Sequence, residues 1–335
     1  MTTRLRTYVA ASAAIIALAL SACSGGASAP ASGAAGGQSI SSDKALADLK
    51  AAGVLKVGTE GTYSPFNYHD EATGELTGYD VEVITAVANK LGVKVEFSET
   101  KWDAIFAGLE AKRFDVIAGQ VTVNEERAAK YDLTDPYTFS VPVGVVSEKN
   151  TEITSYEAIK GKKSAQSATS NWRGLAEDGG AKIETVEGFT EAVASLRDGR
   201  VDLTINDNLA VADYLKKQKN PGIKIAFKLP EKAVNQAFVL RKDSGLVPAF
   251  NQALEELAAD GTLAKISEKY FGEDVSIPPT GVGGAQSGAQ SGASAQSGSA
   301  QSGAASQSGA ASQSGATASQ SGSADQAASS AQSAQ

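Results

Sequence analysis

Residues 114–127 read FDVIAGQVTVNEER, and this stretch carries the chain from a strand into a polar segment. Residues 115–118 are mostly apolar, which is typical of a buried strand. Small and hydrogen-bonding side chains follow at 119–124, and Arg127 lies in NEERAAKY, which has the composition of a short helix start. Because ligands gather beyond the carboxyl ends of strands in open α/β sheets, we interpret these polar residues as part of a binding site.

The same alternation of strands and helices extends over residues 40–280. Apolar residues at helical spacing predict amphipathic helices, for example over 81–91, where Gly92 provides a stop. Strands that alternate with helices of this length predict an α/β fold with mostly parallel sheets covered on both faces. The predicted strands are 55–59, 94–99, 115–118, 162–167, 182–186 and 202–206, and the other predicted helices are 105–109, 189–196, 246–259 and 263–271.

This series of elements occurs twice, at about 54–136 and 155–227. Two long extended stretches, 137–148 and 234–242, flank the second series, so the chain should leave one lobe, build a second and return. Two lobes joined by two crossing strands form a hinge, and the cleft between them is where a ligand would be enclosed. The predicted division is 40–140 with 235–280 for lobe 1, and 141–234 for lobe 2.

Both ends of the chain differ in composition from this central part. Residues 1–22 resemble an export signal, with two arginines before an apolar run that is too short to span a bilayer. The signal ends in LSAC, which resembles a lipobox, so we expect Cys23 to carry a lipid that anchors the protein to the cell membrane outside the cytoplasm. A plain secretory signal is the alternative. The small residues that dominate 23–39 indicate a flexible tether, and the AQSG-type repeats of 281–335 indicate a disordered tail.

Composition argues against several classes of function. Cys23 is the only cysteine, so no disulfide forms within the chain and no cysteine-based metal cluster is available. The single histidine, His69, lies in the polar turn NYHDEATGE, which argues against histidine triads and histidine-rich zinc sites. The formal charge is −8 and falls to about −10 when the two signal arginines are removed, which disfavours nucleic acid as a partner. We expect no metal and no cofactor.

Polar segments follow several of the predicted strands and would meet at the same edge of each sheet. Three of them, KWD, QSATSNW and NDN, also open a predicted helix, and at a helix start backbone N–H groups and the helix dipole favour an anion. The segments are GTEGTYSPF (58–66), KWD (101–103), GQVTVNEER (119–127), QSATSNW (166–172) and NDN (206–208).

These segments offer the groups that bind a small zwitterion. Arg127 can grip a carboxylate through two parallel N–H donors, and the backbone N–H groups at 169–170 lie at a helix start. Asp207 supplies the opposite charge for an ammonium group. Tyr63 and Trp102 supply aromatic faces for the rest of the ligand.

Each of these residues also has a purely structural explanation. Arg127 could pair with Glu125 or Glu126, and Trp102 could belong to the core. Helix or strand capping is the alternative for the remaining polar residues, which are Gln120, Thr122, Ser170 and Asp207. Taken together, their positions at matching strand ends favour a binding site.

Several longer segments resemble the solute-binding proteins of ABC importers, in the polar amino acid family (bacterial extracellular solute-binding protein family 3). The resemblance covers about residues 45–275 and implies a two-lobed periplasmic-binding-protein fold of type II, with two mixed, mostly parallel sheets joined by two hinge strands. AQSATSNW and TINDNLA are similar to the cystine-binding members, although Ala168 replaces the usual glycine. The matching segments are GTEGTYSPFNY, LTGYDVEV, KWDAIFAGLEAKRFDVIAGQVTVNEER, YDLTDPY, GRVDLTINDNLAVADYL and DGTLAKISEKYFG.

The resemblance also implies roles for individual residues. Arg127 would hold the ligand carboxylate with Thr122, and Asp207 would take the α-ammonium group with help from the backbone of 119–120. Aromatic residues would bracket the ligand side chain, and Glu60 would reach that side chain or the ammonium. The complete predicted set is Glu60, Tyr63, Phe66, Trp102, Gly119, Gln120, Thr122, Arg127, Gln166, Thr169, Ser170, Asn171 and Asp207.

The predicted ligand is a polar amino acid, with cystine ahead of the others. A cystine-sized ligand would use Gln166, Asn171 and Asn208 around its second amino acid head. Glu60 also admits arginine or lysine, although a basic ligand would usually want more than one nearby carboxylate. Binders of a basic amino acid or of glutamine therefore stay open as alternatives.

The predicted function is a non-catalytic, monomeric binder that presents its amino acid to an ABC permease and the associated ATPase. A lipid anchor and a flexible tether fit this function, because the binder must stay near the membrane and still dock. An exported enzyme on the same fold, such as a dehydratase or a lytic murein enzyme, is the main rival. A sensory receptor module is a third alternative.

Overall fold

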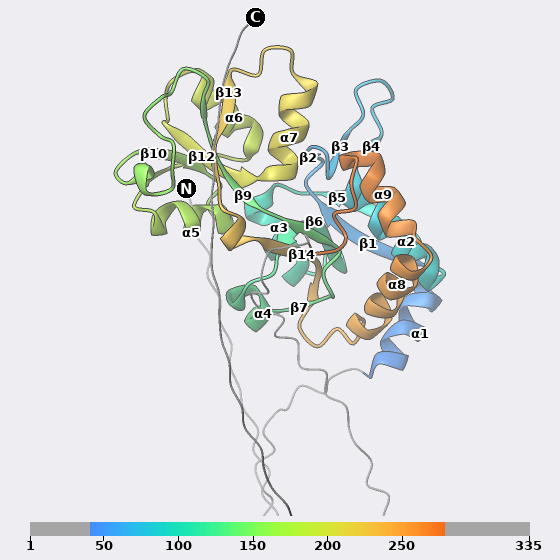
Figure 1. Ribbon diagram of the computed structural model, residues 1–335. Helices are drawn as coiled ribbons and strands as arrows, with labels where there is room; N and C mark the ends of the chain where they lie inside the picture. The colour runs from blue at the N-terminus through green and yellow to red at the C-terminus, as the bar shows by residue number, and fades with distance from the viewer. Residues whose placement is uncertain (1–40, 279–335) are drawn as a thin grey trace, which may run out of the picture. The chain divides into compact units, whose positions relative to one another are not determined.

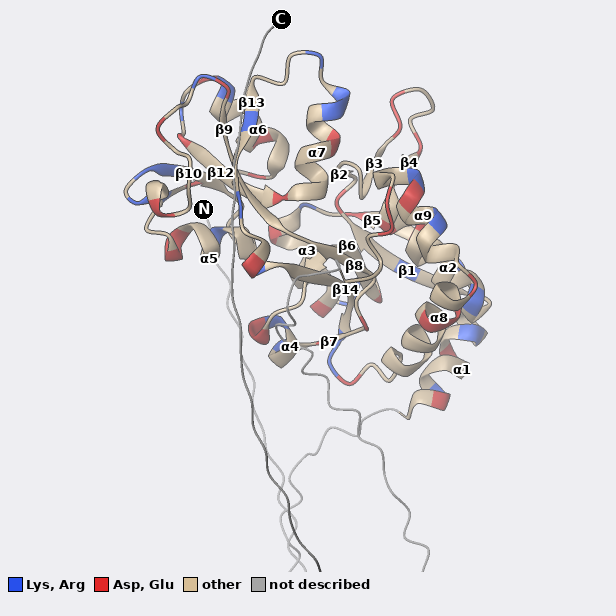
Figure 2. Cartoon of the chain, in the orientation of Figure 1, with Lys and Arg blue, Asp and Glu red and all other residues tan. Residues whose placement is uncertain are grey.

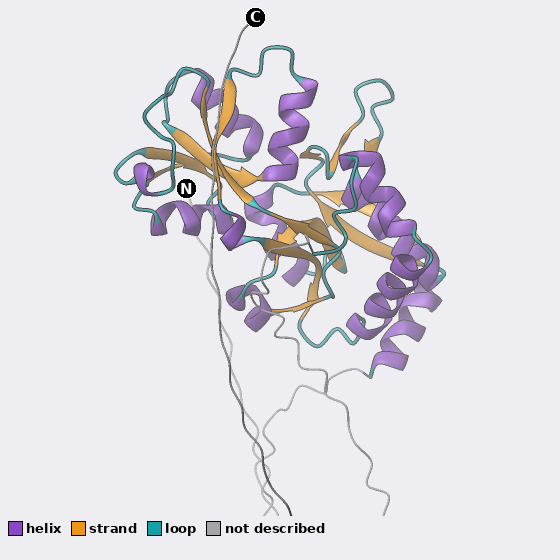
Figure 3. Cartoon of the chain, viewed as in Figure 1, coloured by secondary structure: helices purple, strands orange, loops and turns teal. Residues whose placement is uncertain are grey.

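The alternation of strands and helices is present in the computed structural model, which describes residues 41–278 (Figure 1). The predicted signal peptide, Cys23, the tether and the Ala/Gln/Ser/Gly-rich tail lie outside these residues. Two larger sheets, each with helices packed on both faces, make up the described part of the chain, and a short three-stranded sheet accompanies the first (Figure 3).

The first sheet combines parallel and antiparallel strands in the order β5-β1-β6-β14-β7, with β8 also paired to β14. β1 runs parallel to β5 and β6, whereas β14 runs antiparallel to β6, β7 and β8. The bounds are β1 Val54–Thr59, β5 Lys94–Glu99, β6 Val116–Thr122, β7 Tyr131–Leu133, β8 Thr138–Ser140 and β14 Val234–Arg241.

Helices cover both faces of this sheet because each presents an apolar stripe to it. One face carries α1, α2, α8 and α9, whose buried residues form a single cluster that includes Ile84 and Phe250. The other face carries α3, whose Ile105 and Leu109 pack against Ile117 of β6. The bounds are α1 Ser42–Ala52, α2 Tyr79–Leu91, α3 Trp102–Glu110, α4 Glu125–Lys130, α8 Val247–Ala259 and α9 Thr262–Phe271.

The second sheet has the order β11-β10-β12-β9-β13. β10 runs parallel to β11 and β12, and β9 runs antiparallel to β12 and β13. Its helices are α5 (Asn171–Asp178), α6 (Phe189–Arg197) and α7 (Asn208–Lys217), with single 3-10 turns η1 (Glu157–Ile159) and η2 (Pro230–Lys232). The strands are β9 Pro142–Ser147, β10 Lys163–Gln166, β11 Lys182–Thr185, β12 Leu203–Asp207 and β13 Ile223–Lys228.

The chain passes between the sheets twice, from β8 into β9 and from β13 into β14. At the first crossing, the N–H of Val141 donates to Asn208 Oδ1 (2.7 Å), and its carbonyl accepts from the N–H of Asn208 (3.0 Å). The Oδ2 atom of Asp207 accepts from Ser140 Oγ (2.5 Å) and Gln236 Nε2 (3.4 Å). Both crossings are therefore fastened to the start of α7.

β6 is longer than the sequence predicts. The predicted strand covered 115–118, whereas the structure continues it to Thr122. The antiparallel neighbour β14 explains this, because Gln236 stands opposite Thr122 and the whole of β6 is buried. Gln120 adopts a left-handed backbone conformation (φ 52°) within the strand. The polar side chains at its end therefore belong to the strand itself and not to a turn beyond it.

A small three-stranded sheet was not predicted. It consists of β2 (Thr62–Tyr63), β3 (Asn67–His69) and β4 (Leu76–Thr77), which pair antiparallel between β1 and α2. Its strands are too short to show a clear alternation of apolar and polar residues. This sheet carries Tyr63.

Charged residues of both signs are spread over the helices of both lobes (Figure 2). Lys90, for example, pairs with Asp260 at 2.9 Å, and both side chains are partly exposed. Such exposed pairs contribute about 0–1 kcal/mol each, so the stability of the fold rests on the buried clusters. Within the part of the chain that the structure describes, no helix combines the length and the apolar composition needed to cross a bilayer.

Gly144→Ala should destabilise the second lobe. A Cβ atom at Gly144 would lie 2.2 Å from ring atoms of the buried Phe227. Overpacking of this kind costs about 1–3 kcal/mol, which lowers the melting temperature of a core of this size by roughly 2–12 °C. Differential scanning calorimetry measures the loss. Gly174→Ala in α5 is the control, because its Cβ meets nothing within 4 Å; an equal loss there would contradict the packing explanation.

Candidate functional site

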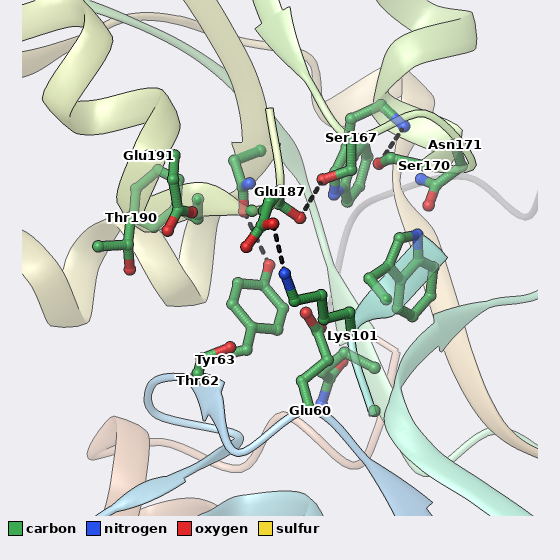
Figure 4. A pocket seen from close by; sticks show the side chains of 17 residues that line it. Glu60, Thr62, Tyr63, Lys101, Ser167, Ser170, Asn171, Glu187, Thr190 and Glu191 are labelled. Atoms are coloured by element: carbon green, nitrogen blue, oxygen red, sulfur yellow. Dashed lines mark hydrogen bonds and ion pairs between the residues drawn. The ribbon is translucent and has the colours of Figure 1, made fainter. Parts of the chain in front are cut away.

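A cavity of about 280 Å³ lies between loops of the two lobes (Figure 4). Its volume is close to the lower end of the range for small-molecule sites, about 300–1,000 Å³. The first lobe contributes Glu60, Thr62, Tyr63, Lys101, Trp102, Gly119 and Gln120 to the wall. The second lobe contributes Ser167, Ser170, Asn171, Trp172, Glu187, Gly188, Phe189, Thr190, Glu191 and Asn206.

The structure brings only part of the predicted ligand-binding set to the wall of this cavity. The predicted residues that line it are Glu60, Tyr63, Trp102, Gly119, Gln120, Ser170 and Asn171. The others are absent from its lining among the described residues: Phe66, Thr122, Arg127, Gln166, Thr169 and Asp207. What these six contact decides what each can do.

Arg127 lies directly behind the cavity wall. Its guanidinium carbon is 5.4 Å from the ring centre of Trp102 and 5.5 Å from that of Phe106. Nη1 donates to the carbonyl of Thr122 at 2.8 Å, and Nη2 approaches the carbonyl of Thr169 at 3.4 Å. The side chain thus touches both lobes at the edge of the cavity.

The charge of Arg127 is balanced only in part, by the more distant carboxylate of Glu126. Within residues 41–278 it forms no ion pair, and the pairing with Glu125 or Glu126 that the sequence left open is absent; Glu126 pairs with Lys130 instead (2.9 Å). Arg127 is only 6 % exposed, and this burial lowers the pKa of its guanidinium to about 10. A buried cation without a partner is costly, so the position suits an anion brought by a ligand.

The two backbone donors predicted to assist Arg127 already have partners within the protein: the N–H of Ser170 donates to the carbonyl of Ser167 (3.3 Å), and that of Thr169 donates to a side chain. Asp103 Oδ1 accepts from the N–H of Thr169 (3.0 Å) and from its Oγ1 (2.8 Å), and Oδ2 accepts from the N–H of Ala168 (3.3 Å). Asp103 belongs to α3 of the first lobe, so this contact joins the lobes. Ser170 caps α5, because its Oγ accepts from the N–H of Trp172 (3.2 Å).

Asp207 is part of the hinge. In addition to its contacts with β8 and β14, its Oδ1 accepts from the N–H of Leu209 (2.8 Å), which makes it the N-cap of α7. Burial raises the pKa of its carboxyl to about 6, against the lowering effect of these hydrogen bonds. Its neighbour Asn206 lines the cavity, where its Oδ1 accepts from Tyr63 Oη (2.7 Å) and links the two lobes.

Other predicted residues belong to the cores of the lobes. Phe66 is fully buried, with its ring 5.0 Å from that of Tyr63 and 5.8 Å from that of Phe271. Gln166 donates to Ser164 and Thr204 inside the second sheet. With Asn208 held at the crossing, only Asn171 of the polar set predicted for a second amino acid head lies at the cavity.

The wall of the cavity is acidic. Glu60, Glu187 and Glu191 face it, and Lys101 bridges the lobes by pairing with Glu187 at 2.5 Å (Figure 4). Burial raises the pKa of Glu60 to about 7, and the negative charges of Asp103 and Glu191 add to the shift. A positively charged group near Glu60 would reverse these effects and favour its ionised form.

The sequence interpretation missed the residues of 187–191. They follow β11 and open α6, so the rule that placed the other segments at strand ends applies to them as well. Gly188, the N-cap of α6, was the signal that could have identified this segment. In the described chain, no group of three or more His, Cys, Asp or Glu side chains is arranged to hold a metal ion.

Known proteins resemble this chain over the same region. The L-cystine-binding protein TcyA of Bacillus subtilis is 55% identical over 231 residues, which cover 69% of this chain and 85% of that protein. A probable amino-acid ABC transporter-binding protein of Haemophilus influenzae is 51% identical over 221 residues, which cover 66% and 86%.

A solved structure of a cystine receptor is also similar to this chain. The L-cystine solute receptor of Neisseria gonorrhoeae, in the unliganded open conformation, is 46% identical and has a TM-score of 0.50, over 70% of this chain and 99% of that one. The predicted fold class is confirmed: two mixed sheets in two lobes, as in the type II periplasmic-binding proteins. The family profile of bacterial extracellular solute-binding proteins, family 3, matches residues 55–273. The chain therefore belongs to the bacterial extracellular solute-binding proteins of family 3.

Proposed function

We propose that the protein is the substrate-binding component of an amino acid ABC importer and encloses a polar amino acid, cystine before others, between its lobes. The observation that carries this proposal is the buried guanidinium of Arg127, which has no carboxylate partner among the described residues and lies against the cavity wall. A ligand carboxylate would supply the missing charge in a bidentate geometry that suits arginine.

The positive end of the ligand is proposed to lie near Glu60. This carboxylate lines the cavity, and its raised pKa reflects burial beside other acids, which an ammonium group would relieve. Asp207 stays a predicted partner for the α-ammonium group. To bind the ammonium group, the carboxylate of Asp207 would have to reach the cavity beside Asn206 while it keeps its hydrogen bonds in the hinge.

Cystine is proposed as the ligand because a relative that is 55% identical to this chain is an L-cystine-binding protein. Its two amino acid heads carry two ammonium groups and two carboxylates. The acidic wall at Glu60, Glu187 and Glu191 offers places for a second ammonium, and Lys101 offers a cation for a second carboxylate. A basic amino acid is the second candidate, because the same wall supplies the additional carboxylates that such a ligand requires.

We propose that the protein performs no chemistry on this ligand. Glu60 is the cavity residue whose pKa of about 7 would suit acid–base catalysis, and a binding role accounts for that value equally well. The lipid on Cys23, the docking to a permease with its ATPase and the monomeric state are likewise proposals. They rest on the sequence and on the relatives' names as transporter-binding proteins.

A thermal-shift screen tests the ligand. L-Cystine at a thousandfold excess over Kd should stabilise the protein by about 4 kcal/mol, which raises the melting temperature by roughly 8–16 °C. Arginine, lysine, glutamine and glutamate are the comparison ligands. A shift with arginine or lysine and none with cystine would transfer the proposal to the basic amino acids, and no shift with any amino acid would contradict it.

Arg127→Met should weaken binding strongly and leave the protein at least as stable as before. Truncating one partner of a buried charge pair costs about 2–5 kcal/mol, so the Kd for L-cystine should rise by a factor of about 30 or more. Without ligand, loss of an unpaired buried charge should keep or raise the melting temperature. Calorimetric titration and thermal unfolding measure the two effects. The exposed Arg200→Met is the control, and unchanged binding in Arg127→Met would mean that the carboxylate is held elsewhere.

Asp103→Ala should weaken binding through loss of contact between the lobes. Its carboxylate accepts three hydrogen bonds from 168–169, so we expect the Kd for L-cystine to rise about tenfold. Asp103→Asn, which keeps an acceptor, should have a smaller effect. Tighter binding in Asp103→Ala would show instead that Asp103 competes with the ligand for the N–H of Thr169.

A further inference from the structure

Asp80 is a fully buried carboxylate near the start of α2, outside the cavity. Oδ1 accepts hydrogen bonds from Tyr137 Oη (2.8 Å) and Gln120 Nε2 (3.0 Å), and Oδ2 accepts one from Asn67 Nδ2 (3.3 Å). No lysine, arginine or histidine of the described chain pairs with it within 4 Å. All its partners are neutral donors, so it does not serve as half of an ion pair.

Two of these partners connect Asp80 to the cavity. Asn67 Oδ1 accepts from the N–H of Gly61 (3.0 Å), the residue after Glu60. Gln120 lines the cavity, has a left-handed backbone, and its Oε1 is buried without a hydrogen-bond partner among the described residues. The carboxylate therefore contacts one residue of the wall, Gln120, directly, and through Asn67 it is linked to Gly61, which follows the wall residue Glu60 in the chain.

We propose that Asp80 is a positioning residue for the ligand cavity: its carboxylate orients the amides of Gln120 and Asn67, and through Asn67 it holds the loop that carries Glu60. The inference deepens the proposed function and rests on it only where ligand affinity is concerned. A carboxylate only accepts hydrogen bonds, so both amides must turn their NH₂ groups toward it. Gln120 then keeps its carbonyl oxygen for a donor, such as an ammonium group, and Asn67 keeps its oxygen for Gly61.

A proton on Asp80 would upset this orientation. If Oδ2 carried a hydrogen, it would meet the NH₂ group of Asn67, donor against donor. Turning the amide of Asn67 would restore that contact and leave the N–H of Gly61 facing another donor. Gly61 itself has little room to adjust, because its φ is 76° and its Cβ position is filled by the carboxylate of Glu99.

Proton binding to Asp80 falls in the neutral range. Burial raises its pKa to about 7, and the hydrogen bonds from Tyr137, Asn67 and Gln120 oppose the rise. The titratable groups around it are Glu60, Tyr63, Tyr79 and Tyr137, none of which is a cation. We call the hydrogen bonds that connect Asp80 through Asn67 to Gly61 the relay. Because the pKa of Asp80 in the folded protein lies above the ordinary value, the charged carboxylate and the intact relay are present above about pH 7. Both are lost as the pH falls through this value.

The first test follows the backbone amide of Gly61 by NMR without ligand, between pH 5.5 and 8. In Asp80→Asn, the protection of this amide against hydrogen exchange should fall about tenfold, with α8 amides unchanged. Asn67→Ala leaves Asp80 in place and should produce the same loss, so the test does not depend on one variant folding. Asp43→Asn, an exposed residue of α1, is the control and should have no effect.

A pH titration separates positioning from a merely structural role. Glu60 also titrates near pH 7, so the experiment uses the Glu60→Gln chain. The protection and chemical shift of Gly61 should change with a midpoint near 7, and Asp80→Asn should remove that change. Protection that is independent of pH in Glu60→Gln, or unaltered by Asp80→Asn and Asn67→Ala, would overturn the proposal.

The second test measures the Kd for L-cystine by calorimetry. Asp80→Asn and Asn67→Ala should each weaken binding about tenfold, and the double variant should be no weaker than Asp80→Asn alone, because removal of the Asp80 charge already breaks the branch through Asn67. Fully additive losses, or unchanged affinities, would overturn the link to the cavity. Failure of the unsubstituted protein to bind L-cystine would instead overturn the proposed ligand, while the Gly61 measurements would still decide the relay.

Discussion

The fastening of both chain crossings to the start of α7 is the constraint on which the two-lobed arrangement depends. Asn208 exchanges two hydrogen bonds with Val141 in the first crossing, and Asp207 reaches Gln236 in the second. Any change in the angle between the lobes must turn about this point. The same constraint explains why Asp207 is only 2 % exposed, whereas Asn206, one residue earlier on the strand, faces the cavity.

Charge is distributed unevenly around the cavity. Arg127 forms no ion pair within the described chain and lies at one edge, while Glu60 is buried on the wall, where burial and the charges of Asp103 and Glu191 raise its pKa. A protein selected for stability alone would place these opposite charges together or replace them with apolar residues. Their separation costs stability, and a ligand with charges of both signs would recover it. Functional sites commonly contain charged groups whose arrangement lowers the stability of the protein in the absence of a ligand.

The elements of the fold could be predicted largely from the sequence, because each depends on a local pattern. The strand at 94–99 coincides with β5, and Gly92 ends α2 as expected. β6 was predicted too short, because the reason for its extension lies in β14, more than a hundred residues away along the chain. Periodicity within a window carries no information about such a partner.

The candidate site was harder to predict for the same reason. Tyr63 and Trp102, which were predicted from their positions at strand ends, line the cavity. Phe66 lies in the core instead, and a phenylalanine at a strand end and one in the core look alike in a sequence. The contact of Asp103 with Thr169 joins residues 66 positions apart across the lobes, so no local signal announces it. Sequence patterns place segments at an edge, and only packing decides which side chains face the ligand.

The contacts between the lobes indicate how much of the free energy of closure the ligand has to supply. Lys101 and Glu187 are more than half exposed, and the hydrogen bonds that Thr169 donates to Asp103 are exposed as well, so water competes for each of these contacts. Exposed contacts of this kind contribute about 0–1 kcal/mol each, so these contacts favour the closed arrangement but do not by themselves hold the lobes shut. A ligand shifts the equilibrium only by its difference in affinity for the two states. Arg127, which already reaches the carbonyl of Thr169 across the gap, is where that difference would be largest, because a carboxylate bound there would touch both lobes only after they have met.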